Sequence, residues 1–307
     1  MSRYKVLLVM IFSMLLGNSV VVIAADFAKG WEAYKLGDYE FALEELVPLA
    51  KQGDSYAQLI LGIMYESGQG VLKNDTTAVK WYTKAAEMGN ARSQFYLARM
   101  YRNGHGVPQS DKRALKWYTK AAEQGDADSQ YALGSMYASN ADSPENDKIV
   151  LKWQTKAAEQ GHPDAQFFLA VMYHNGIGVS QNYKKALKWF TKAGNQGNAV
   201  AQFQLGLMYS SDKGALEDNQ VAVEWYTKAA HRGYADAQIN LGYMYENGNG
   251  VLTDYVRAYM WYNLGSYNGN KMGTENKTKI AQEMTPAQIA KAQDMSSRCL
   301  DSEYTDC

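Results

Sequence analysis

The sequence predicts an all-α fold, a solenoid built from 36-residue helix-pair repeats. Tryptophan recurs at this interval, and only Trp31 of the seven tryptophans lies outside the register. The six in register are Trp81, Trp117, Trp153, Trp189, Trp225 and Trp261. A methionine followed by a tyrosine recurs at the same interval, from Met64 to Tyr245. Because no insertion separates the copies, we expect six repeats within residues 54–269, at 54–89, 90–125, 126–161, 162–197, 198–233 and 234–269.

Each repeat is expected to contain two helices. In the first repeat Asp54 can cap a helix whose apolar residues follow at spacings of three and four, and Gly68 and Gly70 end it. A second helix contains Trp81 and ends at Gly89. Favourable N-cap residues precede every second helix, at Asn74, Ser110, Asn146, Asn182, Asp218 and Asp254. First helices begin at Asp or Asn, with His162 and Tyr234 as exceptions.

Two repeats lack the usual glycine pair between the helices. The third has Asn140 and Asp142, followed by Pro144, and the fifth has Asp212 and Gly214. We interpret these changes as drift that alters the loops and leaves the fold intact, since asparagine also adopts the left-handed conformation. A specialised contact site at either loop is the alternative.

The flanking segments predict a leader and two caps. Residues 1–24 have basic residues, a mostly apolar run and small residues at the end, which is typical of a secretory signal peptide cleaved after Ala24. An uncleaved signal anchor is the alternative, because about nineteen mostly apolar residues can span a bilayer. Residues 25–53 predict an N-terminal capping helix pair, and residues 270–307 predict C-terminal capping helices and a tail. Within the latter, Thr285 and Pro286 should start a final helix.

The composition excludes some classes of partner. A net charge of −1 argues against general affinity for nucleic acid or anionic lipid, so membrane contact is expected only if the signal peptide stays uncleaved. Cys299 and Cys307 are the only cysteines. In an exported protein they can form a disulfide, and two free thiols are the equally weighted alternative.

The residues of the repeat resemble a known family. Gln58 to Tyr65 reads QLILGIMY, Gly68 to Val71 reads GQGV, and Ala78 to Ala86 reads AVKWYTKAA. These runs are similar to the Sel1-like repeat (SLR), a 36-residue relative of the tetratricopeptide repeat, and the similarity covers residues 54–269. The resemblance implies a right-handed α/α superhelical solenoid that serves as an adaptor or scaffold, often exported in bacteria. The helix pair in residues 25–53 looks like a tetratricopeptide pair.

Comparison of the copies separates scaffold from variable surface. Four offsets on the first helix change freely while their neighbours stay fixed, and their spacings of four, three and four place them on one helical face. In tetratricopeptide-like stacks the first helices line the concave face, so we name this row the variable stripe and expect it to bind protein. Its candidate residues are Tyr56, Ile60, Arg92, Tyr96, Arg99, Asp128, Asp164, Phe168, Val171, Gln204, Leu207, Asn240 and Tyr243. The alternative is that some of its aromatic residues only pack between first helices.

Lysines also recur in register on the second helices. They are Lys84, Lys120, Lys156, Lys192 and Lys228. Glu87, Glu123 and Glu159 follow the first three and can offset their charge. We favour a solvated outer face over an anion-binding track.

Signatures of catalysis are nearly absent, so we expect no enzyme, no cofactor and no metal. The four histidines lack metal-ligand spacing and are interpreted as surface residues. Outside the signal peptide, Ser210 to Lys213 is the only S-x-x-K match, and it lacks the SDN and KTG partners of a penicillin-binding site.

The expected function is a monomeric, non-enzymatic protein–protein interaction scaffold, periplasmic or secreted, with protein or peptide partners in the bacterial envelope or a host. The alternatives are a peptidoglycan-associated module of the cell wall and a β-lactamase-like hydrolase of the exported type.

Overall fold

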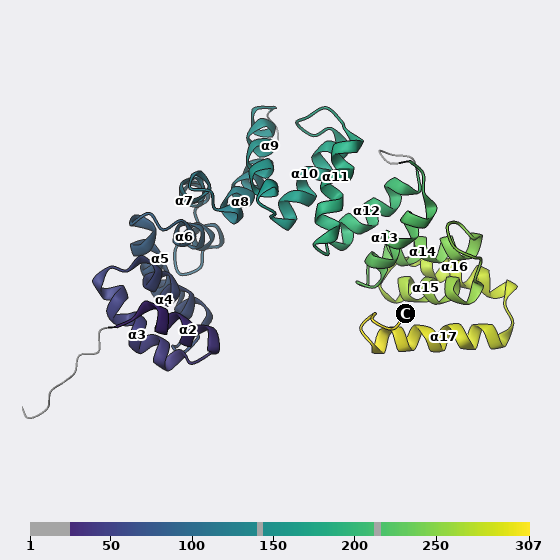
Figure 1. The fold of residues 1–307 in the computed structure, drawn as a ribbon, viewed down its shortest axis with the longest axis horizontal. Coiled ribbons are helices and arrows are strands. Elements are labelled where there is room, and N and C mark those ends of the chain that lie inside the picture. The colour runs from purple at the N-terminus through teal and green to yellow at the C-terminus, as the bar shows by residue number, and fades with distance from the viewer. Residues whose placement is uncertain (1–24, 140–143, 212–215) are drawn as a thin grey trace, which may run out of the picture. The chain divides into compact units, whose positions relative to one another are not determined.

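The computed structural model describes residues 25–139, 144–211 and 216–307 (Figure 1). These ranges are all-helical, with sixteen α-helices and no strand. The predicted signal peptide, residues 1–24, lies outside them, as do Asn140, Asp142, Asp212 and Gly214. Within the described ranges, no helix combines the length and apolarity that crossing a bilayer requires. The chain divides into two compact units, at Met1–Ala114 and Leu115–Cys307, and the division falls within α7 (Asp111–Glu123).

The first unit packs helices that follow one another in the chain. They are α2 (Phe27–Leu36), α3 (Tyr39–Gln52), α4 (Ser55–Ser67), α5 (Asp75–Glu87) and α6 (Ala91–Asn103). Each packs against the next, so α2 and α3 cover the open end of the first repeat (Figure 1). The amide of Gln69 fastens this cap, because it accepts a hydrogen bond from Tyr34 Oη at 3.1 Å and donates one to Tyr39 Oη at 2.8 Å.

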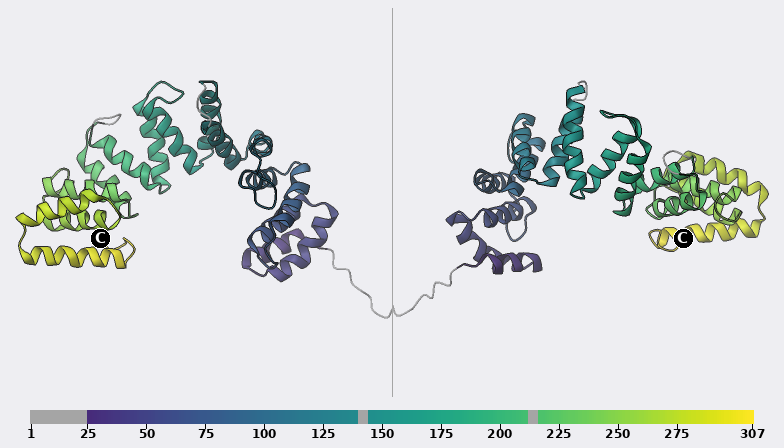
Figure 2. Two further views of the ribbon diagram at one scale, coloured as in Figure 1. Left: turned by 180° about the vertical axis from the view of Figure 1, so that it is seen from behind. Right: turned by 45° about the horizontal axis from the view of Figure 1, so that its top comes forward.

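The second unit continues the same pairing. Its helices are α8 (Ala127–Ala138), α9 (Pro144–Glu159), α10 (Pro163–Asn175), α11 (Tyr183–Asn195), α12 (Ala199–Tyr209), α13 (Asn219–Ala230), α14 (Ala235–Asn247), α15 (Tyr255–Tyr267), α16 (Lys271–Ile280) and α17 (Pro286–Asp301). A 3₁₀ turn, η1 (Ala281–Glu283), joins the last two. The final helix lies beside α15 in the views of Figures 1 and 2.

The helix caps follow the predicted positions with one correction. Asn74, Asn182, Asp218 and Asp254 each accept a hydrogen bond from a first-turn N–H of the following helix. Asn146 does not cap α9, because that helix begins at Pro144 and includes it. Proline is favourable in a first turn, where its missing N–H would be unpaired anyway, so the helix can start earlier than in the other repeats.

Small residues on the first helix accommodate the aromatic ring of the second. A Cβ added at Gly62 would lie 2.4 Å from the ring of Tyr82, and one at Gly206 would lie 2.4 Å from the ring of Tyr226. Both rings are buried. In the third repeat Gln154 takes the place of the ring and packs on Gly134. The glycines therefore make room for the side chain that joins the two helices of a repeat.

The second glycine of the interhelical loop allows contact with the preceding repeat. A Cβ at Gly106 would lie 2.4 Å from the backbone carbon of Asp75, and one at Gly250 would lie 2.3 Å from the backbone oxygen of Asn219. Both glycines also have positive φ. Since any side chain would push the loop away, the glycine pair sets the separation of adjacent repeats as well as the helix end.

A buried glutamine links each first helix to the helix before it. Its Nε2 donates to a backbone carbonyl eight residues earlier, at 2.8 to 3.1 Å, in all six repeats. These residues are Gln58, Gln94, Gln130, Gln166, Gln202 and Gln238. We name this set the glutamine row. In three repeats an amide from the following turn donates to the Oε1 of the row glutamine, at 2.7 to 2.9 Å.

The lysines of the second helices lie on the tryptophans. The Nζ of Lys84, Lys120, Lys156, Lys192 and Lys228 lies 4.0 to 5.0 Å from the ring centroid of the tryptophan three residues earlier. These contacts are cation–π interactions on an outer surface, and each contributes about 0.5–1 kcal/mol when exposed. Recurrence of lysine is therefore explained by its contact with tryptophan.

The last repeat departs from this pattern because α17 covers it. Leu264 stands where earlier repeats have lysine, and it is fully buried together with Trp261 and Cys299. Cys299 and Cys307 form a disulfide that closes the C-terminal turn. Thr285 and Gln288 form the capping box of α17, as its sequence predicts.

Candidate protein-interaction surface

The variable stripe contains exposed, half-buried and buried side chains. Tyr56 is 62% exposed and Tyr243 is 53% exposed, and Asp164 is exposed as well. Ile60 is an error in the predicted surface: it is 5% exposed and belongs to the core formed by α2, α3 and α4. It is buried because the N-terminal cap, α2 and α3, packs apolar side chains against it.

In the first unit, the stripe residues around Tyr96 are held by one another. The ring of Tyr96 stacks on Tyr82, with centroids 5.2 Å apart, and the guanidinium carbons of Arg92 and Arg99 lie 5.3 and 4.8 Å from its centroid. Arg99 also pairs with Glu66 at 2.5 Å. Tyr96 and Arg99 are half-buried, and Tyr96 packs on a second helix, α5, through Tyr82.

The hydroxyl of Tyr82 completes this group. It donates to Glu66 at 2.7 Å, and burial, followed by the negative charge of Glu66, raises the pKa of the Tyr82 phenol above its ordinary value. Tyr82 is therefore a neutral donor at any physiological pH. Glu66 in turn accepts from both Tyr82 and Arg99, which fixes Arg99 across the face of α6.

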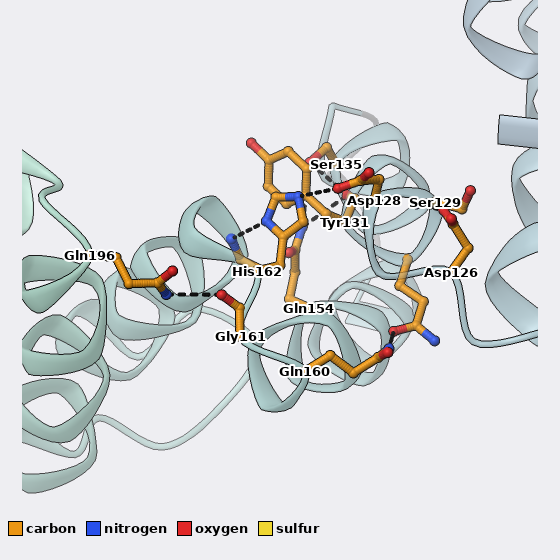
Figure 3. A network of polar contacts seen from close by, with 12 residues as sticks. Asp126, Asp128, Ser129, Tyr131, Ser135, Gln154, Gln160, Gly161, His162 and Gln196 are labelled. Carbon is orange, nitrogen blue, oxygen red and sulfur yellow. Dashed lines mark hydrogen bonds and ion pairs between the residues drawn. The ribbon is translucent and has the colours of Figure 1, made fainter. Parts of the chain in front are cut away.

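In the second unit, Asp128 takes part in a polar network between the third and fourth repeats (Figure 3). His162 Nδ1 accepts from the N–H of Ala165 at 3.3 Å, and His162 Nε2 lies 3.3 Å from Asp128 Oδ1. The imidazole also stacks on Tyr131, with centroids 4.6 Å apart. Because Nδ1 accepts, the proton is on Nε2, which donates to Asp128. His162 thus replaces the usual Asp or Asn cap, and its side chain is only 11% exposed, which corrects its assignment as a surface residue.

Phe168 and Val171 are half-buried against the core of the second unit. They offer only part of their surface to solvent. Gln204 is half-buried too.

The stripe residues of α12 and α14 converge on one cavity, which we name the α12–α14 cavity. Leu207, Asn240 and Tyr243 line a space of about 450 Å³. Asn219, Asn249 and Ser210 line it as well, although none of them was a predicted site residue. Glu217 and Met244 are lining residues too. The cavity therefore combines an apolar wall, an exposed aromatic ring, one acidic side chain and several amide and hydroxyl groups that can donate or accept hydrogen bonds.

Tyr226 supplies a hydroxyl to the wall of this cavity. Its Oη lies 3.2 Å from Ser210 Oγ, and burial raises the pKa of its phenol above the ordinary value. Ser210 Oγ also donates to the backbone oxygen of Leu207 at 3.2 Å. Ser210 is the C-cap residue of α12, and its hydroxyl bonds within this helix end and to Tyr226. Lys213, the other end of the S-x-x-K match, lies outside the described residues.

The described residues contain no cluster of metal-ligating side chains. In the described ranges, no three His, Cys, Asp or Glu residues are grouped so that they could hold an ion.

Sequence reasoning missed two sets of residues that the structure brings together. The glutamine row recurs at the interval of the tryptophans, so its register was visible, but its carbonyl partners belong to another helix. The amides and hydroxyls of the α12–α14 cavity occupy unrelated registers, and no single helical face collects them.

Comparison with known proteins agrees with this architecture. The family profile described as Sel1 repeat matches residues 55–90, 91–126, 127–162, 163–198, 199–234 and 235–270. No curated protein matches the chain. Sel1 repeat proteins are typical of protein–protein interaction scaffolds and are in general non-catalytic.

Two solved structures are similar over most of the chain. One is a protective antigen present in uropathogenic Escherichia coli strains that displays an SLR fold, 32% identical over 91% of this chain and 69% of that one, with a TM-score of 0.58. The other is a Sel1 repeat protein from Oxalobacter formigenes, 31% identical over 79% of this chain and 97% of that one, with a TM-score of 0.67. With six matched repeats and these relatives, the chain belongs to the Sel1 repeat family.

Proposed function

We propose that this protein is a non-enzymatic protein–protein interaction scaffold, exported to the bacterial envelope or secreted, and that the α12–α14 cavity binds a partner protein. The observation that carries the proposal is the convergence of three variable residues, Leu207, Asn240 and Tyr243, on one cavity. Unlike Ile60 and Tyr96, which pack on the scaffold, these three variable residues line a cavity. Their gathering at one place therefore favours recognition.

The chemistry of the cavity suits a segment of polypeptide. Leu207 offers an apolar contact, and Asn219, Asn240 and Asn249 can each donate to a backbone carbonyl and accept from a backbone N–H. Tyr243 is half exposed beside them, and tyrosine contributes large contact area at low cost in side-chain entropy. We expect the partner to place an extended or looped segment across these groups.

Export is supported by two features. The leader pattern of residues 1–24 is typical of a secretory signal peptide. The disulfide between Cys299 and Cys307 fits an oxidising compartment. Cell fractionation with alkylation of free thiols tests both: a protein found in the cytoplasm with two alkylatable cysteines contradicts the proposed location.

Photocrosslinking in the native cell tests the binding surface. A benzoyl-phenylalanine placed at Tyr243 should capture a discrete protein, because that side chain borders the α12–α14 cavity. The matched control carries the same group at Tyr267, which is 71% exposed on α15 and outside this cavity.

Substitution separates recognition from stability. Asn240→Ala in the protein crosslinked at Tyr243 should lower the yield of the captured band while the melting temperature changes little. Equal yields from the Tyr243 and Tyr267 positions, or recovery of peptidoglycan fragments in place of a protein, would count against this function. Light scattering of the purified chain checks that it is a monomer without its partner.

A further inference from the structure

Asp26, the N-cap residue of α2, has an unusual hydrogen-bond partner. Its backbone N–H donates to Glu45 Oε2, a side-chain atom of α3, at 2.6 Å. In the first helix of every Sel1 repeat, and in α16, the N–H of the N-cap residue donates instead to a backbone carbonyl of the preceding helix, at 3.0 to 3.2 Å. These donors are Asp54, Asn90, Asp126, His162, Asn198, Tyr234 and Asn270. Since no described helix precedes α2, a carboxylate takes the place of that carbonyl.

Glu45 is a buried carboxylate without a cation. It is 9% exposed, and none of the ion pairs within the described ranges includes it. Gly30 of α2 lies directly on it, because a Cβ there would be 3.0 Å from Glu45 Cβ and 2.8 Å from Leu46 Cγ. Buried charges in proteins are normally paired, whereas a neutral carbonyl is enough for the same N–H in the other helices. The start of α2 therefore has a negative charge that an adjacent cation would match.

The nitrogen of Ala25 is placed to become that cation. Three covalent bonds separate it from the nitrogen of Asp26, so the two atoms lie within about 4 Å of each other. Asp26 nitrogen is itself 2.6 Å from Glu45 Oε2, and rotation about the Ala25 Cα–C bond can bring a free amine at Ala25 into contact with the carboxylate. The carboxylate of Asp26 is already engaged, because its Oδ1 accepts from the N–H of Ala28 at 2.9 Å.

Removal of the leader changes the chemistry of this nitrogen. In the uncleaved chain it belongs to a neutral peptide bond with Ala24. Hydrolysis of that bond consumes one water, leaves a carboxylate on Ala24 and frees the Ala25 nitrogen as an amine, which takes up a proton. The resulting α-ammonium group is largely charged at neutral pH and has three N–H donors.

We propose that Glu45 is the binding site for the α-ammonium group that cleavage after Ala24 creates at Ala25. This inference rests on the proposed export, since it requires the leader to be removed. The ammonium donates to Glu45 beside the N–H of Asp26 and ties the start of α2 to α3. The N-terminal cap thus reaches its full stability only in the mature chain, and in the precursor it opens more readily.

The N-terminus of the protein purified from the native cell is the first test. Mass spectrometry of the intact chain and of its N-terminal peptide should find a chain that starts at Ala25 with an unmodified amine. An uncleaved chain would overturn this inference together with the proposed removal of the leader. Cleavage at another bond, or a modified amine, would overturn this inference alone. Capture of a partner at Tyr243 is measured separately and does not depend on either result.

Hydrogen exchange of the mature chain, residues 25–307, tests the ion pair. The chain with a free α-amine is compared with the same chain acetylated at that amine, which removes the charge. Backbone amides of α2 should exchange at least about tenfold faster in the acetylated chain, because a hydrogen bond to a charged group is worth about that factor or more. Exchange in α14, which belongs to the other compact unit, should be the same in both chains. Equal exchange of α2 in the two chains would overturn the proposal.

Glu45→Gln separates the charge from the hydrogen bond. The amide oxygen of glutamine can still accept from the N–H of Asp26, so the variant should fold, and acetylation should no longer accelerate exchange in α2. Glu44→Gln is the matched control: it removes an exposed charge from the neighbouring position of α3, and acetylation should keep its full effect. A full effect of acetylation in Glu45→Gln would show that Glu45 does not bind the amine. If Glu45→Gln unfolds the cap, the comparison of free and acetylated native chains decides by itself.

Discussion

The same substitution should have different effects at two positions of the glutamine row. Gln166 Nε2 donates to Ala158 at 3.1 Å, and Gln166 Oε1 accepts from Gln196 at 2.7 Å. Gln202 keeps only the first kind of bond, because Arg232 replaces the amide donor. Both side chains are 4% exposed. Replacing each glutamine with leucine allows the two losses of stability to be compared. The Gln166 variant loses two hydrogen bonds, whereas the Gln202 variant loses one hydrogen bond and one unpaired buried acceptor.

The expected magnitudes follow from this difference. Gln166→Leu loses two hydrogen bonds at about 0.5–1.5 kcal/mol each, so the free energy of opening around it should fall by about 1–3 kcal/mol. Gln202→Leu loses one bond of that size but removes a buried unpaired oxygen, whose cost is about 1–3 kcal/mol. The net change at Gln202 should be close to zero or stabilising. Leucine has nearly the volume of glutamine, so cavity formation does not distinguish the two variants.

Hydrogen exchange of backbone amides is the suitable assay. Repeat arrays can open in parts, so one global unfolding curve would average over the repeats. Exchange in α10 and α11 should accelerate strongly in Gln166→Leu, whereas exchange in α12 and α13 should change little in Gln202→Leu. Equal acceleration in both variants would refute the argument that the second hydrogen bond separates them.

Three further changes test the packing between elements. Gly250→Ala should destabilise by more than about 1 kcal/mol in urea unfolding, because its Cβ would lie 2.3 Å from the backbone oxygen of Asn219 at a φ of 73°. Gly269→Ala has the strained φ alone, with nothing within 4 Å, and a loss equal to that of Gly250→Ala would exclude the steric contact as the cause. Burial lowers the pKa of His231, so its neutral form stabilises the fold fully above the unfolded pKa of about 6.5, and this contribution is lost as the pH falls through the lowered pKa. His231→Gln should reduce the fall in melting temperature between neutral and acidic pH, and parallel curves would contradict this linkage. Leu264→Lys would bury an unpaired charge beneath α17 and should cost about 3 kcal/mol or more, with faster tryptic cleavage after Lys291. Unchanged cleavage there would mean that α17 does not depend on this contact.

Most of the architecture could be predicted because the repeat supplies six readings of each position. The capping residues and the helix ends were visible in this way, and the final capping box at Thr285 was visible from its own local motif. The start of α9 was not, because a proline near the usual cap moved it to Pro144 and removed Asn146 from the cap position. A single copy that differs from the rest provides no comparison.

The candidate surface was harder to predict, because helical periodicity shows which residues share a face but not what covers that face. Ile60 shares the stripe with Tyr96 and Asn240, yet the N-terminal cap buries it. Tyr96 is held by Tyr82, Arg92 and Arg99, whereas Asn240 opens onto a cavity. Their different surroundings come from neighbouring helices, and those contacts depend on residues in other registers.

The sequence by itself determined the helix pairs, the 36-residue register and the division between constant and variable positions, because these depend on local capping, on spacing and on recurrence. Only the tertiary structure decided which atoms the constant residues contact. It joined the row glutamines to the preceding helices and left Gln202 without its second partner beside Arg232. These contacts link residues eight to thirty apart in the sequence, and their geometry exists only after the helices have stacked.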